Sequence, residues 1–172
     1  MKADELRAVQ APLKTAYRDD PSAGKITLSA RAKLDMNDIV CKLETGKAMV
    51  EAGLHPAAGG SGAAACSGDM LLEALVACAG VTLNAVATSL GIPLKSGTVS
   101  AEGDLDFRGT LGVSKEVPVG FSDIRLRFDL ETEASAEQVA TLVKLTERYC
   151  VIYQTLRTPP RVVVSTGVAT SS

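Results

Sequence analysis

The feature that most constrains the fold is a run of helix-forming, mostly apolar residues from Asp69 to Leu90. Asp69, or Ser67 before it, is placed to cap the start of this helix, and Gly91 with the Ile-Pro pair that follows stops it. At about 1.5 Å per residue, the helix approaches the length of a membrane span. Polar side chains within the run favour instead a helix buried at the centre of a fold; they are Glu73, Thr82, Asn84, Thr88 and Ser89.

Strands are predicted on both sides of this helix. Before it, Ile26–Leu34 alternates apolar and polar residues, and a turn leads into an antiparallel partner strand over Ile39–Glu44. After it, residues 97–107 and 121–131 are two further strand candidates, joined by a long hairpin loop from Gly109 to Gly120. Near the start of the chain we expect one or two helical turns in residues 2–10, which Pro12 ends, and then a short strand over Leu13–Tyr17.

A second helix is predicted from the capping-box sequence Ser135-Ala136-Glu137-Gln138 to Thr158, where two prolines end it. Its apolar residues recur at helical spacing: Val139, Leu142, Val143, Leu145, Tyr149, Cys150 and Tyr153. The valines Val162–Val164 predict a short closing strand. The order strands, helix, strands, helix, strand indicates an α+β fold and not a doubly wound sheet.

Composition limits the class of protein. The 172 residues are enough for one core, so we expect a single domain over 1–172 with an N-terminal extension at 1–12. A net charge of −2 without a basic cluster argues against nucleic acid as a partner, and we expect no membrane association. The first residues carry charges with no apolar run behind them, which argues against a secretory signal. We therefore expect a cytoplasmic protein whose four cysteines are thiols.

Two of the four cysteines carry the candidate chemistry. No C-x-x-C pair occurs, and a single histidine, His55, excludes a His-rich metal site within one chain, so we predict no metal. Cys78 and Cys150 lie within the two predicted helices, whereas Cys41 lies in a strand and Cys66 in a Gly/Ala-rich loop. A cysteine taken alone is most often a small buried hydrophobe. The two helix cysteines would approach each other only if their helices pack together, and a mid-helix thiolate would need an arginine from elsewhere.

Two segments resemble the OsmC/Ohr family of osmotically inducible and organic hydroperoxide resistance proteins. They are SGDMLLEALVAC at residues 67–78, a helix opening that leads to a cysteine, and ERYCVI at 147–152, a later helix with the second cysteine. The resemblance spans roughly residues 13 to 165. It implies an OsmC-like α+β fold with antiparallel sheets around two long central helices, in an intertwined homodimer with its active sites at the subunit interface.

The resemblance implies a thiol-dependent peroxidase acting on organic hydroperoxides in the response to oxidative stress. Cys78 matches the residue that becomes a sulfenic acid, and Cys150 matches the residue that condenses with it to a disulfide. A dithiol, for example a dihydrolipoyl protein, would reduce that disulfide, and no cofactor is implied. Arg18 resembles the arginine that orients the thiolate, with Arg31 as a second candidate, and Asp69 lies near the family's acidic position.

The sequence also departs from the family pattern. No proline precedes Asp69, where the family commonly has Pro-Glu, and Val151 follows Cys150 where proline is frequent. These departures motivate an alternative from another class of protein, a catalytically inactive OsmC-like dimer that binds a small apolar ligand. Consumption of peroxide by the wild type but not by Cys78→Ser distinguishes the two hypotheses.

Overall fold

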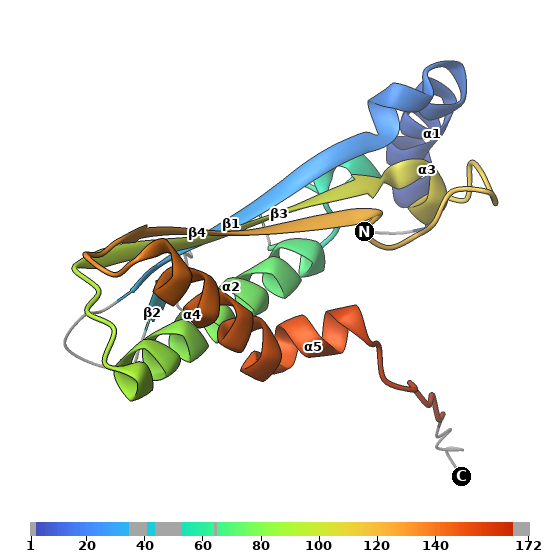
Figure 1. The fold of residues 1–172 in the computed structure, drawn as a ribbon. Coiled ribbons are helices and arrows are strands. Elements are labelled where there is room, and N and C mark those ends of the chain that lie inside the picture. Colours follow the sequence, from blue (N-terminus) through green and yellow to red (C-terminus); the bar gives the residue numbers. More distant parts are fainter. Residues whose placement is uncertain (1–2, 35–40, 44–52, 64, 167–172) are drawn as a thin grey trace, which may run out of the picture.

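Four antiparallel strands form one sheet in the computed structural model, which describes residues 3–34, 41–43, 53–63 and 65–166 (Figure 1). The sheet order is β2-β1-β3-β4, and the strands are β1 (Lys25–Leu34), β2 (Cys41–Leu43), β3 (Ser96–Asp106) and β4 (Asp123–Glu131). The strands predicted by alternation are thus confirmed to within about two residues. For the predicted Ile39–Glu44 strand, the described part is β2, which pairs antiparallel with β1; its other residues lie outside the described ones.

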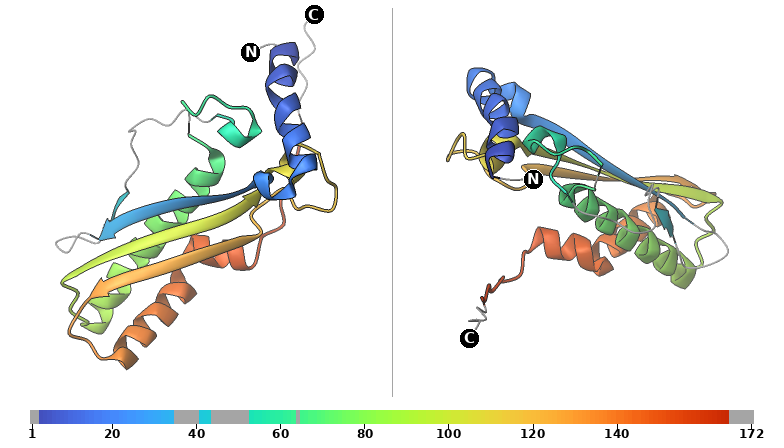
Figure 2. Two further views of the ribbon diagram at one scale, coloured as in Figure 1. Left: turned by 90° about the horizontal axis from the view of Figure 1, so that it is seen from above. Right: turned by 180° about the vertical axis from the view of Figure 1, so that it is seen from behind.

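The long helix α2 (Ser67–Leu90) packs against one face of this sheet, and α4 runs beside it on the same face (Figures 1 and 2). Its buried side chains recur every three or four residues and pack on Val99 and Ala101 of β3; they are Leu72, Leu75, Val76, Ala79, Leu83 and Ala87. Gly91 ends the helix in the left-handed conformation, as predicted, with φ 64°.

The start of α2 and its burial both differ from the prediction. Cys66 is the N-cap residue; its carbonyl accepts from the Met70 N–H and its side chain makes no capping bond, so neither Ser67 nor Asp69 caps the helix. Only one face of α2 is covered, because the sheet and α4 lie on that face. The opposite face carries Leu71, Ala74, Val81 and Ala85, all of them exposed.

By length and composition, α2 is the one helix among the described residues that would be able to cross a membrane. A core helix passes the same test, and 44% of the most apolar part of α2 is buried within the fold. Its contacts with β1, β3 and α4 are those of a core helix.

The second predicted helix is broken in two. α4 (Ala136–Tyr149) begins with the expected capping box: Gln138 N–H donates to Ser135 Oγ (3.2 Å) and Ser135 N–H donates to Gln138 Oε1 (2.9 Å). At Cys150 the backbone becomes extended (φ −71°, ψ 109°), and a new helix, α5, runs from Val151 to Arg157. The prediction of one continuous helix through Cys150 is therefore wrong.

The N-terminal segment is a single helix, α1 (Ala3–Asp19), which continues through Pro12. The predicted strand over Leu13–Tyr17 is wrong, because Leu13 and Tyr17 are four residues apart and so share one helical face. That face packs against Ala57, Ala58 and Phe107, and the Tyr17 hydroxyl donates to the Ala57 carbonyl at 2.7 Å. Short helical turns complete this end of the sheet: η1 (Pro21–Gly24), η2 (Pro56–Ala58) and α3 (Phe107–Thr110).

The predicted closing strand is also absent from the described chain. Residues 161–166 have no regular structure, and Val162, Val163 and Val164 are 79%, 72% and 84% exposed. A β-branched run forms a strand only where a sheet edge lies alongside it. The chain leaves α5 in a direction away from the sheet, so the three valines find no partner strand among the described residues (Figure 1).

Candidate active site

The break between α4 and α5 places Cys150 at the junction of two helices. The Cys150 N–H donates to the Thr146 carbonyl of α4 (2.9 Å), and the Cys150 carbonyl accepts from the Gln154 N–H of α5 (2.9 Å). Its sulfur caps α5 by accepting from the Tyr153 N–H at 3.5 Å. Cys150 is 1% exposed, whereas Cys78, which faces it from α2, is half-buried. The expectation that both thiols occupy mid-helix positions therefore fails for Cys150.

The two thiols are free, and each shifts the pKa of the other. Burial alone would raise the pKa of Cys78, but hydrogen bonds from the Ile152 N–H, the Cys150 thiol and the Val151 N–H outweigh it. The pKa of Cys78 consequently lies below the ordinary thiol value. Thr82, four residues further along the same helix, adds a fourth hydrogen bond to this sulfur.

Cys150 has the opposite electrostatics. Burial raises the pKa of Cys150, and its hydrogen bond to Cys78 and the charge on that sulfur raise it further, to about 11. The Tyr153 N–H acts in the other direction but does not offset them. Cys78 is therefore the thiol of the pair that ionises first, and Cys150 holds its proton and donates it to the Cys78 sulfur as a hydrogen bond.

The three charged residues singled out from the sequence lie elsewhere in the described chain. Arg18 is exposed in the last turn of α1, which packs beside α3 and η1 at one end of the sheet (Figure 1). Arg31 lies in β1, opposite Ser100 of β3, and its side chain is outside the described part. Asp69 is in the first turn of α2, about 13 Å along the helix axis from Cys78. Burial raises the pKa of Asp69, and the charge of His55 opposes that shift.

Among the described residues, the groups that lower the pKa of Cys78 come partly from the backbone. The groups that lower the pKa of Cys78 are two amides, one thiol and one hydroxyl, and none of them is a cation. The amides of Val151 and Ile152 were not predicted, because residues 136–157 contain no glycine or proline to mark a helix break. The proximity of Thr82 to Cys78 could have been predicted from the sequence, since residues i and i+4 share one face of a helix.

A cavity of about 530 Å³ adjoins the thiol pair between β4, α4 and α5. The cysteines themselves do not line it, but two of their neighbours do: Leu75 lies one turn before Cys78, and Tyr153 donates its N–H to Cys150. The side chains that line it are mostly apolar, with a few polar ones: Leu75, Phe121, Ser122, Asp123, Ile124, Leu126, Phe128, Val143, Glu147, Tyr153, Leu156 and Arg157. Such a lining suits a largely apolar small molecule.

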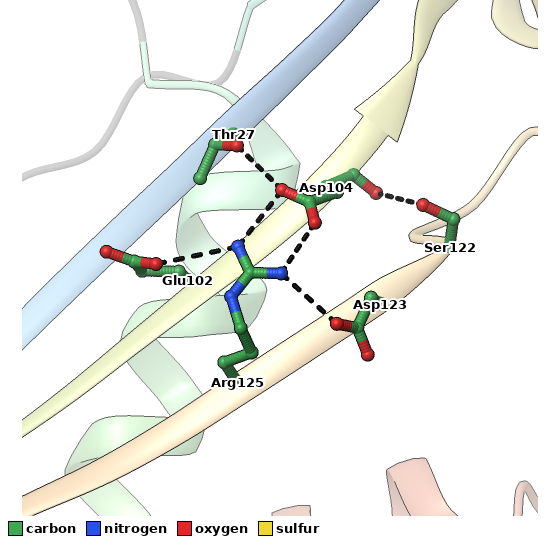
Figure 3. A network of polar contacts seen from close by, with 6 residues as sticks. All are labelled: Thr27, Glu102, Asp104, Ser122, Asp123 and Arg125. Carbon is green, nitrogen blue, oxygen red and sulfur yellow. Dashed lines mark hydrogen bonds and ion pairs between the residues drawn. The ribbon is translucent and has the colours of Figure 1, made fainter.

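A polar network centred on Arg125 is separate from the thiols and joins three strands (Figure 3). The Arg125 guanidinium binds Asp104 through both terminal nitrogens, at 2.5 and 3.0 Å, and also Asp123 at 3.1 Å. The Thr27 hydroxyl donates to the same Asp104 carboxylate at 2.6 Å. Hydrogen bonds from Arg125 and Thr27 lower the pKa of Asp104 to about 2. The network lies on the solvent-exposed surface of the sheet, where its charges pair with one another.

Comparison with known proteins assigns the chain to a family. A family model described as OsmC-like protein matches residues 59–165, more than half of the 172 residues. The chain belongs to the OsmC-like protein family. The match includes α2, α4 and α5, and with them both cysteines of the pair.

A solved structure shows the same fold as this OsmC-like chain. The crystal structure of an OsmC-like hydroperoxide resistance protein from Jannaschia sp. CCS1 superposes with a TM-score of 0.60 and covers 86% of this chain and 97% of its own. The two sequences are 15% identical, so the likeness concerns the fold alone. A search of curated proteins finds no match.

Proposed function

We propose that this OsmC-like protein is a thiol-dependent peroxidase that reduces organic hydroperoxides. The observation that carries the proposal is the packing of Cys78 against the cluster that contains Cys150, which lowers the pKa of one thiol and raises that of the other. A thiolate is the nucleophilic form of cysteine, and a second cysteine beside it is the partner needed to close a disulfide. Membership of the family and the fold of the Jannaschia protein support the same chemistry.

In the first step the Cys78 thiolate attacks the terminal oxygen of the hydroperoxide ROOH. The O–O bond breaks, a sulfenic acid forms on Cys78, and the RO⁻ leaving group takes up one proton and departs as an alcohol. In the second step the sulfur of Cys150 attacks the Cys78 sulfur and loses its proton, while hydroxide leaves and becomes water. An external dithiol then reduces the disulfide and is itself oxidised, which restores both thiols; a dihydrolipoyl protein is the reductant we propose.

The cavity beside the thiols supports an organic substrate over hydrogen peroxide. Its lining of leucine, phenylalanine and tyrosine side chains provides apolar surface for the alkyl group of the peroxide. Because the sulfur of Cys78 is half-buried, small peroxides also reach it, and the preference lies in the apolar contacts.

We further propose that the protein works as a homodimer in the cytoplasm. The uncovered face of α2, with Leu71, Ala74, Val81 and Ala85, has Cys78 along the same helical stripe. A second copy placed there would bury this apolar stripe and put the thiols at the interface between subunits.

The test is the consumption of cumene hydroperoxide, tert-butyl hydroperoxide and hydrogen peroxide with dithiothreitol or dihydrolipoamide as reductant. We expect wild type to turn over, Cys78→Ser to be inactive, and Cys150→Ser to react once but not to form the intramolecular disulfide. Cys66→Ser is the matched control and retains activity. Equal slow rates in wild type and Cys78→Ser would exclude the peroxidase and leave the alternative, a dimer that binds a small apolar ligand in the 530 Å³ cavity.

A further inference from the structure

The break at Cys150 redirects two backbone donors. In an uninterrupted helix the N–H of Val151 would donate to the carbonyl of Glu147, and the N–H of Ile152 to that of Arg148. Among the described residues neither bond is formed, because Cys150 is extended and α5 begins a new helix at Val151. Both N–H groups instead act on the sulfur of Cys78, whose pKa they lower.

This redirection leaves the carbonyl of Glu147 without its helical donor. An unpaired backbone carbonyl in a half-buried position costs free energy, and the chain would regain it by continuing the helix. The side chain of Gln154, one turn into α5, reaches back and donates its Nε2–H to this carbonyl at 2.7 Å. The Gln154 backbone N–H also donates to the Cys150 carbonyl at 2.9 Å, so a single residue bonds on both sides of the break.

We propose that Gln154 is a positioning residue: its side-chain amide takes the place of Val151 N–H on the Glu147 carbonyl and so keeps the α4–α5 break open toward Cys78. Its side-chain and backbone N–H groups donate to the carbonyls of Glu147 and Cys150, and it acts on Cys78 through the amides of Val151 and Ile152. The inference rests on the proposed function for its catalytic meaning, since the thiolate that these amides stabilise is the proposed nucleophile.

Removal of this amide has a defined consequence. In Gln154→Met, which keeps the length of the side chain but has no donor, the Glu147 carbonyl regains a partner only if Val151 N–H turns back to it. Cys78 then loses a hydrogen bond to its charged form. The loss of one such bond moves the apparent pKa of Cys78 upward by about one unit, so that its alkylation at neutral pH slows about tenfold.

The experiment follows alkylation of Cys78 by iodoacetamide from pH 5 to 9 in the full chain, in a Cys41→Ser/Cys66→Ser background, with mass spectrometry to assign the labelled peptide. Cys150 is the titratable group in contact with Cys78, and its high pKa keeps it protonated over this range. The matched control is Thr155→Met, which places the same new side chain at the next, exposed position of α5. Far-UV circular dichroism and urea unfolding establish that each variant is folded.

We expect the Cys78 titration to move upward in Gln154→Met and to stay in place in Thr155→Met. Coincident titration curves for Gln154→Met and its parent would overturn the inference. If Gln154→Met does not fold, Gln154→Asn decides the matter: it retains the amide but is one methylene too short to span the break, and the same upward shift is expected. The proposed function is judged separately, because a parent without peroxide turnover refutes the peroxidase whether or not the titration moves.

Discussion

The raised pKa of Cys150 predicts a loss of stability in alkaline solution that can be calculated from the structure. The pKa is about 11 in the folded chain against 9.0 for an unperturbed thiol. Between these values the unfolded chain has lost this proton while the folded chain retains it, so the free energy of unfolding falls as pH rises. Two pKa units correspond to about 3 kcal/mol, lost from pH 9 to pH 11. Cys78 causes no change within this window, because its lowered pKa makes the free energy of unfolding rise with pH only up to pH 9.0, and above that value the gain is complete and constant.

Urea unfolding under reducing conditions at pH 8, 9, 10 and 11 measures the effect as a difference between wild type and Cys150→Ala. Subtracting the variant removes the titration of lysines and tyrosines, which both proteins share. We expect the difference in the free energy of unfolding between wild type and Cys150→Ala to change by about 3 kcal/mol across the window. The same comparison made in a Cys78→Ser background should give a smaller change, because the neighbouring thiolate is absent. Parallel pH curves for wild type and Cys150→Ala would refute the reasoning, since they would mean that burial and the contact with Cys78 leave the proton affinity of Cys150 unaltered.

Three further predictions test the packing around the site, each by the free energy of unfolding in urea. Leu83→Ala removes a side chain of α2 with no exposed surface and costs about 3 kcal/mol; a loss below 1 kcal/mol would place Leu83 outside the core. Ser135→Ala removes one half of the capping box of α4 and costs about 1 kcal/mol, whereas Ser135→Asp retains most of it. Gly103→Ala places a methyl group 2.5 Å from the ring of Phe121, which lines the cavity. It costs about 1–3 kcal/mol and weakens binding of apolar peroxides, and an unchanged KM for cumene hydroperoxide would contradict that role of Phe121.

Local pattern was sufficient for the elements whose own side chains decide their structure. The alternation in Ile26–Leu34 and in 121–131 predicted β1 and β4, and Ser135 with Gln138 predicted the start of α4 because the capping box forms within four residues. The fold class followed from the order of these elements. In each case the stabilising contacts lie between neighbours in the sequence or on one face of one element.

Local pattern failed where a distant contact decides the backbone. Nothing between Ala136 and Arg157 marks the break at Cys150, which is compensated by contacts with Cys78 and by the Gln154 amide. A distant contact also decides α1. Pro12 predicted the end of a helix, but α1 continues to Asp19, where Tyr17 packs on the turn at residues 55–58. The family resemblance predicted Cys78 and Cys150 as the pair that carries the chemistry. The amides of Val151 and Ile152 were not predicted, because every residue other than proline has a backbone amide and the sequence does not distinguish one from another.

The ion pairs around Arg125 affect which surface of the protein can bind another macromolecule. Glu102, Asp104, Asp123 and Arg125 keep the sheet surface that carries them hydrated, and covering them with another protein would strip water from four charged groups at once. Binding of a macromolecule to that sheet surface would therefore carry a large desolvation cost. The exposed apolar face of α2, with Leu71, Ala74, Val81 and Ala85, carries no such cost. A cluster of paired surface charges thus lies on the sheet around Arg125, whereas Cys78 lies on α2, the helix that carries the exposed apolar residues Leu71 and Val81.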